Sequence, residues 1–122
     1  VVWYDTEDAK YMEREAARYL RGIQGCTACV CYNDQIALKL MHICRINGIR
    51  IPEDLSIVGV DNSRLSAQAG ASITSAENQA GRLGEAAGEM AVDMIENAGR
   101  PESMELPPRL VIRKSVKTVY QP

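Results

Sequence analysis

Two short apolar segments, each followed by Asn and Asp residues, constrain the fold of this chain most strongly. Residues 27–32 and 55–60 are continuous apolar runs, typical of strands buried on both faces of a sheet. Between them, residues 35–47 carry apolar side chains on most faces, after Asn33 as a helix N-cap and before Gly48 as a helix stop. Strand, helix and strand in this order predict a parallel β-α-β unit.

The flanking segments extend this pattern. Residues 5–22 form an amphipathic pattern with acids at its start and arginines at its end, as the helix dipole favours. A short extended piece is expected at 73–76, a helix at about 78–98 and a last strand at 110–116, with a loop over 64–72. The expected fold class is therefore α/β, a parallel-sheet sandwich whose helices cover both faces of the sheet.

Composition excludes several functional classes. The 122 residues suit one domain, and 14 Lys or Arg against 16 Asp or Glu give a net charge of −2. Such a chain has no cationic field to hold a nucleic-acid backbone. No apolar run approaches the roughly 20 residues that span a bilayer. The first residues, Val-Val-Trp-Tyr, resemble a strand cut from a longer protein, which leaves a signal peptide upstream open.

Four cysteines raise the question of a metal site. Cys26 and Cys29 have the C-x-x-C spacing, but zinc needs four ligands, and no second such pair is present. The single histidine, His42, lies inside a predicted helix. We therefore expect no metal and no cofactor. Cys29 and Cys31 are interpreted as small apolar residues on one strand face and Cys44 as part of a helix core face, all reduced in the cytosol.

Polar residues at the strand ends are the best candidates for a site. Ligands of open α/β sheets bind beyond the carboxyl ends of the strands, where Asn33 and Asp61 are expected. On neighbouring strands they would lie about 5 Å apart or a small multiple of that distance. A carboxylate and an amide so placed suit the hydroxyls of a small sugar. The structural alternative is that Asn33 only caps a helix and that Asp61 only begins an Asx turn.

Enzymatic function has little support in the sequence. The chain has no G-x-S-x-G, no glycine-rich phosphate loop and no H-E-x-x-H. One enzymatic alternative is a metal-dependent hydrolase in which Asp34 and Asp61 form a carboxylate pair that binds Mg²⁺. A basic cluster near the C-terminus alternates with apolar residues and is interpreted as the solvated face of a strand. Its members are Arg109, Arg113, Lys114 and Lys117.

Four segments resemble, in order, the C-terminal part of the lactose/galactose repressor family. They read CYNDQIAL at 31–38, GIRIPEDLSIVGVDNS at 48–63, ITS at 73–75 followed by RLGEAA at 82–87, and LPPRLVIR at 106–113. The Cys-Tyr-Asn-Asp and Val-Asp-Asn-Ser wordings are closest to the arabinose-repressor branch. The resemblance covers about residues 27–116, and residues 1–25 match only in their strand-helix pattern.

The resemblance implies the C-terminal lobe of a periplasmic-binding-protein-like (type I) domain. In that family two α/β lobes close on a small sugar, and the branch resemblance points to arabinose. A homodimer relays this closure to operator DNA through N-terminal DNA-binding heads. The head, the N-terminal lobe and the first strand and helix of the C-terminal lobe are then absent from residues 1–122. The resemblance also implies that the protein is a cytoplasmic repressor and not an enzyme. The alternative within the fold is an extracytoplasmic sugar-binding protein of a transporter.

Residue roles follow from the same resemblance. Asn33, Asp61 and Asn78 fall on ligand-binding positions, although the family's common His-Pro pair is Asn78-Gln79 here. The loop around Asp5 and Thr6 falls near the position of the family's ligand-stacking aromatic, and Trp3 or Tyr4 could serve there only with a shift in register. The dimer interface would contain residues of the helix after Asn33 and of the loop after Asp61. These are Leu38, Met41, His42, Arg45 and Leu65.

The helix at about 78–98 is expected to cross toward the missing lobe. Its apolar stripe would then lack a partner, so we expect it to dock on the chain's own sheet or to exchange with a second copy. The stripe consists of Leu83, Ala87, Met90, Ala91 and Met94.

Overall fold

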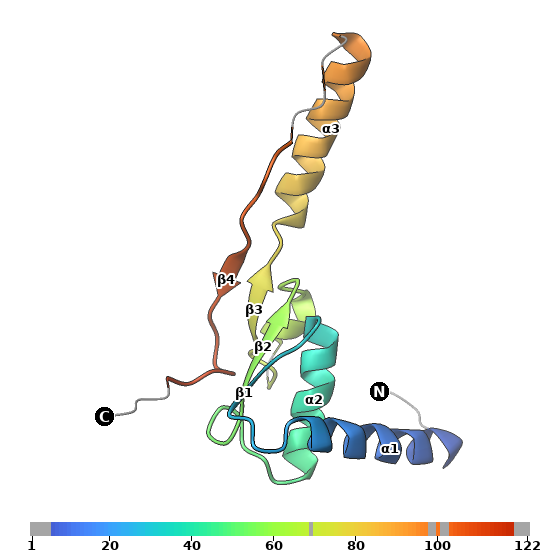
Figure 1. The fold of residues 1–122 in the computed structure, drawn as a ribbon, viewed down its shortest axis with the longest axis vertical. Coiled ribbons are helices and arrows are strands. Elements are labelled where there is room, and N and C mark those ends of the chain that lie inside the picture. The colour runs from blue at the N-terminus through green and yellow to red at the C-terminus, as the bar shows by residue number, and fades with distance from the viewer. Residues whose placement is uncertain (1–5, 69, 98–99, 101–102, 119–122) are drawn as a thin grey trace.

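The computed structural model describes residues 6–68, 70–97, 100 and 103–118, with side chains from residue 14 onward. Its centre is a four-stranded sheet in the order β1-β2-β3-β4 (Figure 1). The strands are β1 (Ala28–Val30), β2 (Ser56–Val60), β3 (Thr74–Glu77) and β4 (Arg109–Val111). The first three are parallel, as expected, whereas β4 pairs antiparallel with β3. The carboxyl ends of β1, β2 and β3 therefore lie at one edge of the sheet.

Helix α2 (Asp34–Ile46) connects β1 to β2 and packs on one face of the sheet. Its start is fixed by Asn33, whose Oδ1 accepts a hydrogen bond from the Ile36 backbone N–H at 2.9 Å. Its end is followed by Gly48 at φ 75°, a left-handed conformation that glycine adopts without strain. Both local signals of the sequence are confirmed.

Helix α1 (Thr6–Gly22) packs against α2. The Lys39 ammonium and the Glu15 carboxylate join the two helices by an ion pair of 2.8 Å. The hydrogen bond from Lys39 lowers the pKa of the Glu15 carboxyl. No helix within the described residues is long and apolar enough to span a membrane.

The hydrophobic core lies between α2 and the sheet. It consists of Cys31, Ala37, Leu40, Cys44, Leu55, Ile57, Ala71 and Ile73. The predicted packing of Cys31 and Cys44 is confirmed, and Cys26 is exposed. Burial, followed by the neighbouring Cys29, raises the pKa of the Cys31 thiol to about 12 and also raises the pKa of Cys44. These thiols are inert packing groups rather than nucleophiles or ligands.

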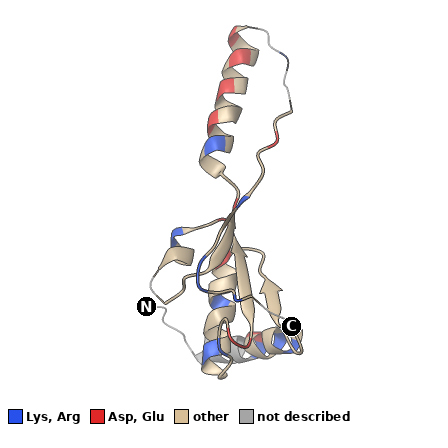
Figure 2. Ribbon diagram, turned by 90° about the vertical axis from the view of Figure 1, so that its left-hand side faces the viewer, with Lys and Arg blue, Asp and Glu red and all other residues tan. Residues whose placement is uncertain are grey.

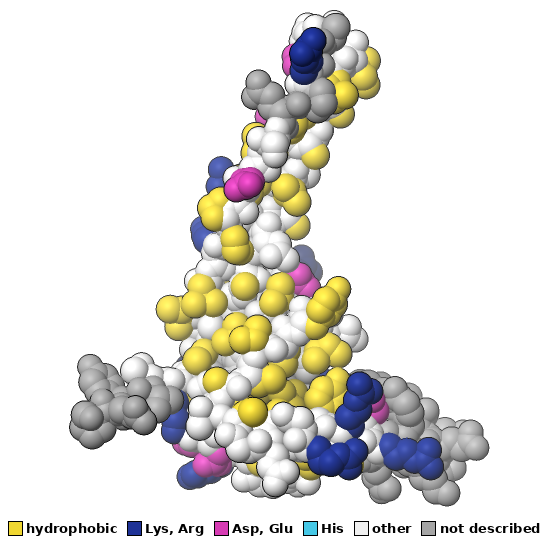
Figure 3. Space-filling view, viewed as in Figure 1, with side chains coloured by type: hydrophobic (Ala, Val, Ile, Leu, Met, Phe, Trp, Pro, Cys, Tyr) yellow, Lys and Arg dark blue, Asp and Glu magenta, His cyan; other side chains and the backbone are white. Residues whose placement is uncertain are grey.

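No described helix covers the opposite face of the sheet, although Thr74 on that face is buried, so the expectation of helices on both faces is wrong for the described residues. In the strand register Val30 pairs with Val58 and Val58 with Thr74, which places them on the same face. Val30 is 75% exposed and Leu110, on the same face, is 60% exposed. Figure 3 shows hydrophobic side chains spread over this part of the molecule. The β-α-β unit accounts for one helix on one face of the sheet, and no described helix lies on the other face.

Helix α3 (Ala80–Glu96) extends away from the sheet, with the return segment 103–108 beside it (Figure 1). None of its residues is buried, and Leu83, Val92, Met94 and Ile95 are exposed. The expected docking of α3 on the chain's own sheet is therefore wrong. The exchange with a second copy stays a prediction. Acidic side chains lie along the helix (Figure 2).

The last strand is shorter than the predicted 110–116 because the chain beyond Val111 is held by side chains as well as by backbone. Ser115 Oγ donates to the Ile57 carbonyl at 2.6 Å and accepts from the Thr74 N–H at 2.8 Å. The Arg113 N–H donates to Thr74 Oγ1 at 2.9 Å. A short 3₁₀ helix, η1 (Arg64–Ala67), interrupts the expected loop after Asp61 and contacts α2.

Candidate functional site

Three polar side chains follow the ends of three adjacent parallel strands. Asn33 follows β1, Asp61 directly follows β2, and Asn78 directly follows β3. Because these strands are neighbours and run in the same direction, the three residues lie at one edge of the sheet. We call Asn33, Asp61 and Asn78 the strand-end rim. It lies where ligands bind in open α/β sheets.

Asp61 and Asn78 are in direct contact. The Asn78 Nδ2 donates a hydrogen bond of 3.0 Å to Asp61 Oδ1, and both side chains are exposed. Asp61 Oδ2 makes no hydrogen bond with the described residues, so the carboxylate has acceptor capacity left for a ligand. A carboxylate beside an amide donor forms the alternating pattern that neighbouring sugar hydroxyls require.

Asn33 caps α2, which is one of the two roles that the sequence left as alternatives, and part of its side chain stays unused. Its Oδ1 is used as the N-cap of α2, but its Nδ2 makes no hydrogen bond with the part of the chain that the structure describes. The half-buried side chain therefore offers donors rather than an acceptor to the rim. Trp3, Tyr4 and Asp5 lie outside the described residues, as does the side chain of Thr6.

Asp34 is not an exposed partner of Asp61, which corrects the carboxylate-pair hypothesis. Its side chain is 1% exposed. Oδ2 accepts a hydrogen bond from the Ser63 N–H and Oδ1 accepts one from the Ser75 hydroxyl, both at 2.6 Å. Both oxygens are thus occupied inside the fold. Among the described residues no group of three or more His, Cys, Asp or Glu side chains could hold a metal ion.

The backbone after β2 has an unusual conformation. Asp61 has φ 95° and Asn62 has φ 48°, both in the left-handed region that residues other than glycine rarely adopt. Two backbone donors fix this turn: the Asp61 N–H binds the Ala76 carbonyl at 2.8 Å, and the Asn62 N–H binds Ser75 Oγ at 3.0 Å. Asn and Asp tolerate positive φ better than other side chains, which is the only local signal for this turn.

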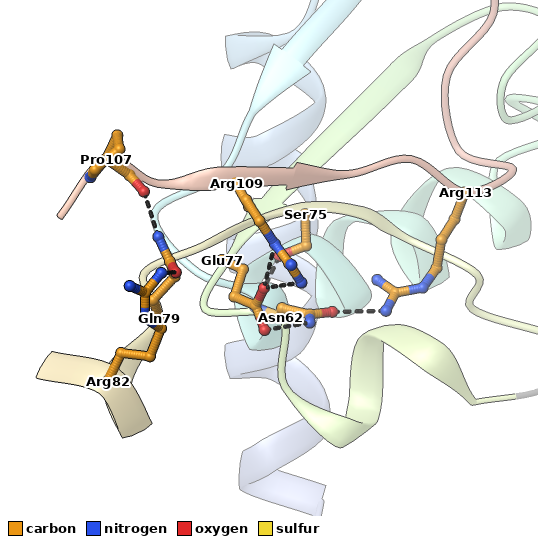
Figure 4. A network of polar contacts seen from close by, with 8 residues as sticks. All are labelled: Asn62, Ser75, Glu77, Gln79, Arg82, Pro107, Arg109 and Arg113. Carbon is orange, nitrogen blue, oxygen red and sulfur yellow. Dashed lines mark hydrogen bonds and ion pairs between the residues drawn. The ribbon is translucent and has the colours of Figure 1, made fainter. Parts of the chain in front are cut away.

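A polar network supports the turn from the side of β4 (Figure 4). The Arg113 guanidinium donates to Asn62 Oδ1 at 2.6 Å, to the Ile73 carbonyl at 2.7 Å and to Ser66 Oγ at 3.1 Å. Asn62 Nδ2 donates to Glu77, whose other oxygen pairs with the Arg109 guanidinium at 2.8 Å. The interpretation of Arg113 as a solvated strand residue is therefore wrong, because Arg113 lies beyond the end of β4 and its half-buried guanidinium donates to three groups of the fold.

Gln79 joins the two segments that connect the sheet to α3. Its Nε2 donates to the Pro107 carbonyl at 2.6 Å, and its Oε1 accepts from Arg82 at 3.0 Å (Figure 4). Gln79 itself has φ 52°. The outgoing and returning segments are thus tied together directly beside Asn78.

The residues predicted for dimer contact lie on a second surface. Leu38, Met41, His42 and Arg45 line an open groove of about 1300 Å³ along α2. Leu65, on the neighbouring η1, is 38% exposed. Within the described residues this face of α2 is open, so the helix is not buried wholly within the domain.

Comparison with known proteins identifies the family. The periplasmic binding protein-like domain family matches residues 1–116. The chain belongs to this family. Within it, the chain is an effector-binding region of the lactose/galactose repressor (LacI) type, near the arabinose-repressor branch. The arabinose metabolism transcriptional repressor of Halalkalibacterium halodurans is 33% identical over 94% of this chain. The PurR transcriptional repressor of Vibrio atlanticus is 36% identical over 76% of it.

Solved LacI-family structures have the same fold. The transcriptional regulator CelR in complex with cellobiose has a TM-score of 0.74 and 25% identity over 85% of this chain and 33% of its own. A LacI-family regulator from Arthrobacter in complex with lactose has a TM-score of 0.72 and 26% identity over 87% of this chain and 40% of its own. The chain spans 33% of the Halalkalibacterium repressor and 28% of the Vibrio repressor. The length of this chain is therefore about a third of the length of these repressors.

Proposed function

We propose that the chain is the C-terminal effector-binding and dimerisation region of a sugar-responsive transcriptional repressor. The observation that carries the proposal is the strand-end rim, in which the Asp61 carboxylate and the Asn78 amide lie 3.0 Å apart and exposed beyond adjacent parallel strands. The relatives named as repressors and the family structures solved with cellobiose, lactose and ribose support it. In this proposal the protein is cytoplasmic and is not an enzyme.

The rim would bind hydroxyl groups by hydrogen bonds alone. Asp61 accepts from two hydroxyls of one sugar, while the amides of Asn33 and Asn78 donate to a hydroxyl or ring oxygen. Helix α3 and the return segment 103–108 lead away from this edge of the sheet, and we assign them to the crossover with a second lobe (Figure 1). A sugar that contacts both lobes stabilises their closed arrangement over the open one. The second lobe and the DNA-binding head belong, in this proposal, to the remaining two thirds of the polypeptide.

The outer face of α2 is the proposed pairing surface of a homodimer. The groove along α2 is lined by Leu38, Met41, His42 and Arg45, with Leu65 nearby on η1. Pairing through these residues would place the two effector sites on either side of one interface. Closure at one site can then bias the geometry of the dimer and of the operator-binding heads.

Arabinose is the first sugar to test because both arabinose-repressor relatives are 33% identical to this chain. The chain and its Asp61→Ala variant are titrated calorimetrically with L-arabinose, ribose, lactose and cellobiose. We expect one sugar to bind with a millimolar dissociation constant, since a single lobe supplies only part of the contacts, worth about 4 kcal/mol. Asp61→Ala should abolish that binding in a chain that still folds, because Asp61 is exposed, although its unfolding midpoint should fall somewhat since alanine tolerates the φ of 95° less well than aspartate.

Equal affinity of the wild-type chain and Asp61→Ala for a bound sugar contradicts the proposed site. A matched control is Asp54→Ala, which removes a carboxylate whose partner is Arg50 at 2.6 Å, away from the strand-end rim. This control should bind the sugar as the wild type does.

A further inference from the structure

A buried carboxylate lies directly beneath the strand-end rim. Asp34 is the first residue of α2 and is 1% exposed, although the charged form of an acid is costly to bury without partners. Its two oxygens accept hydrogen bonds of 2.6 Å from the Ser63 N–H and the Ser75 hydroxyl. It therefore joins α2, the turn after β2, and β3.

These hydrogen bonds hold the residues that follow Asp61. The Ser63 N–H binds Asp34 directly. The Asn62 N–H binds Ser75 Oγ at 3.0 Å, and the same hydroxyl donates its proton to Asp34. Two consecutive backbone donors are thus fixed by one carboxylate, one directly and one through Ser75. Asp61, which comes just before them, has φ 95°, and such backbone persists only where its surroundings hold it.

The chemistry at this point requires a carboxylate. The Ser75 hydroxyl donates toward Asp34 because an ionised carboxylate can only accept, and the Ser63 N–H is always a donor. Two donors converge on one side chain, so both of its oxygens must accept. An asparagine has one acceptor, so its NH₂ group would replace an acceptor at one of these two contacts, and either the Ser63 N–H or the Ser75 hydroxyl proton would lose its partner. Gly59 leaves the space for this carboxylate, because a Cβ there would lie 2.2 Å from Asp34 Oδ1.

We propose that Asp34 is the positioning residue that sets the backbone conformation of Asp61 and thereby aims the Asp61 carboxylate at the effector. Asp34 touches no effector itself. This positioning role rests on the proposed function in one respect, namely that Asp61 contacts a sugar. Because Asp34 also begins α2, the same side chain links the rim to the helix whose outer face is the proposed pairing surface.

Amide hydrogen exchange of the 122-residue chain tests the positioning role. In Asp34→Asn, we expect exchange at Ser63 and Asn62 to accelerate about tenfold more than at the core amides of Leu40 and Ile57, as loss of a charge-assisted hydrogen bond implies. The carbon chemical shifts of Asp61 should also lose their positive-φ values. Ser75→Ala should accelerate Asn62 more than Ser63. Asp54→Asn, which alters an exposed carboxylate, should leave both amides unchanged.

The proposal is overturned if Ser63 and Asn62 accelerate only as much as the core amides, since Asp34 would then act on global stability alone. If Asp34→Asn does not fold, the Ser75→Ala variant decides. Unchanged exchange at the Asn62 amide and unchanged Asp61 chemical shifts overturn the proposal. Faster exchange at Asn62 than at the core amides, together with loss of the positive-φ shifts of Asp61, supports it.

A titration with L-arabinose separates this inference from the proposed function. If arabinose shifts the wild-type resonances of Asp61 and Asn78, Asp34→Asn should weaken that binding at least about tenfold although every rim residue is retained. Equal binding by both proteins overturns the positioning role and leaves the proposed function standing. Selective amide exchange without any arabinose binding by the wild type supports the positioning role and counts against arabinose as the effector.

Discussion

Replacing Gly59 by alanine should destabilise the chain far more than a single methyl group normally does. Gly59 lies in β2, between β1 and β3, so its backbone cannot move without disturbing two ladders. An added Cβ would lie 2.2 Å from Asp34 Oδ1 and 3.2 Å from Asp34 Cα. The carboxylate must rotate away and lose its hydrogen bond from the Ser75 hydroxyl.

The expected cost combines two effects. Overpacking of a tight interior typically costs about 1–3 kcal/mol. A hydrogen bond to a charged group contributes about 1.5–3 kcal/mol. Because one movement of Asp34 causes both losses, we expect about 3 kcal/mol in the free energy of unfolding. For a chain of this length that corresponds to a fall of about 10 °C in the thermal midpoint.

Thermal and urea unfolding followed by far-ultraviolet circular dichroism measures this effect. The matched control is Gly84→Ala in α3, where an added Cβ would meet no described atom within 4 Å beyond the neighbouring residues of its own helix. Alanine is favoured over glycine in a helix by about 1 kcal/mol, so the control should unfold no earlier than the wild type. A Gly59→Ala midpoint equal to that of the wild type would refute the packing of Asp34 over β2.

Three further predictions follow from exposure, burial and charge. Met90→Asp should lower the free energy of unfolding by no more than about 1 kcal/mol, because Met90 is only half-buried and no residue of α3 is buried. A larger loss together with a dimer in sedimentation would show that a second copy covers the helix. Burial, more than any other cause, raises the pKa of the Cys31 thiol to about 12, so above about pH 8.5 the folded state keeps a proton that the unfolded state loses. The free energy of unfolding measured by urea titration should therefore fall as the pH rises above about 8.5. A flat profile between about pH 7 and 10 would contradict this. A gel-shift assay at about 150 mM salt should show no operator complex, because the net charge is −2, and a discrete, competitor-resistant complex would count against it.

Local signals explain how much of the fold the sequence could predict. The apolar runs of β1 and β2, the Asn33 cap and Gly48 act over a few residues, and each is confirmed. The contact between Asp61 and Asn78 follows from parallel strands ending at one edge. Strand direction predicted this edge for Asn33 and Asp61, whereas Asn78 was supplied by the family resemblance.

The features that the sequence did not predict depend on partners far apart in the chain. Asp34 meets Ser63 and Ser75 across 29 and 41 positions, and Arg113 meets Asn62 across 51. The antiparallel direction of β4 likewise depends on the long excursion through α3. No periodicity or cap encodes such pairings, so Asp34 was interpreted as a possible metal ligand and Arg113 as a solvated residue.

The most direct test of the sugar-binding rim is a nuclear magnetic resonance titration of the isotope-labelled chain with the sugar that binds. The account predicts that the side-chain amides of Asn33 and Asn78 and the backbone amides of residues 61–63 shift together along one saturation curve. Resonances of the groove along α2 should stay in place. Saturable shifts confined to that groove, or a rim that no sugar of the panel perturbs in the folded chain, would contradict the assignment of Asn33, Asp61 and Asn78 as the effector site.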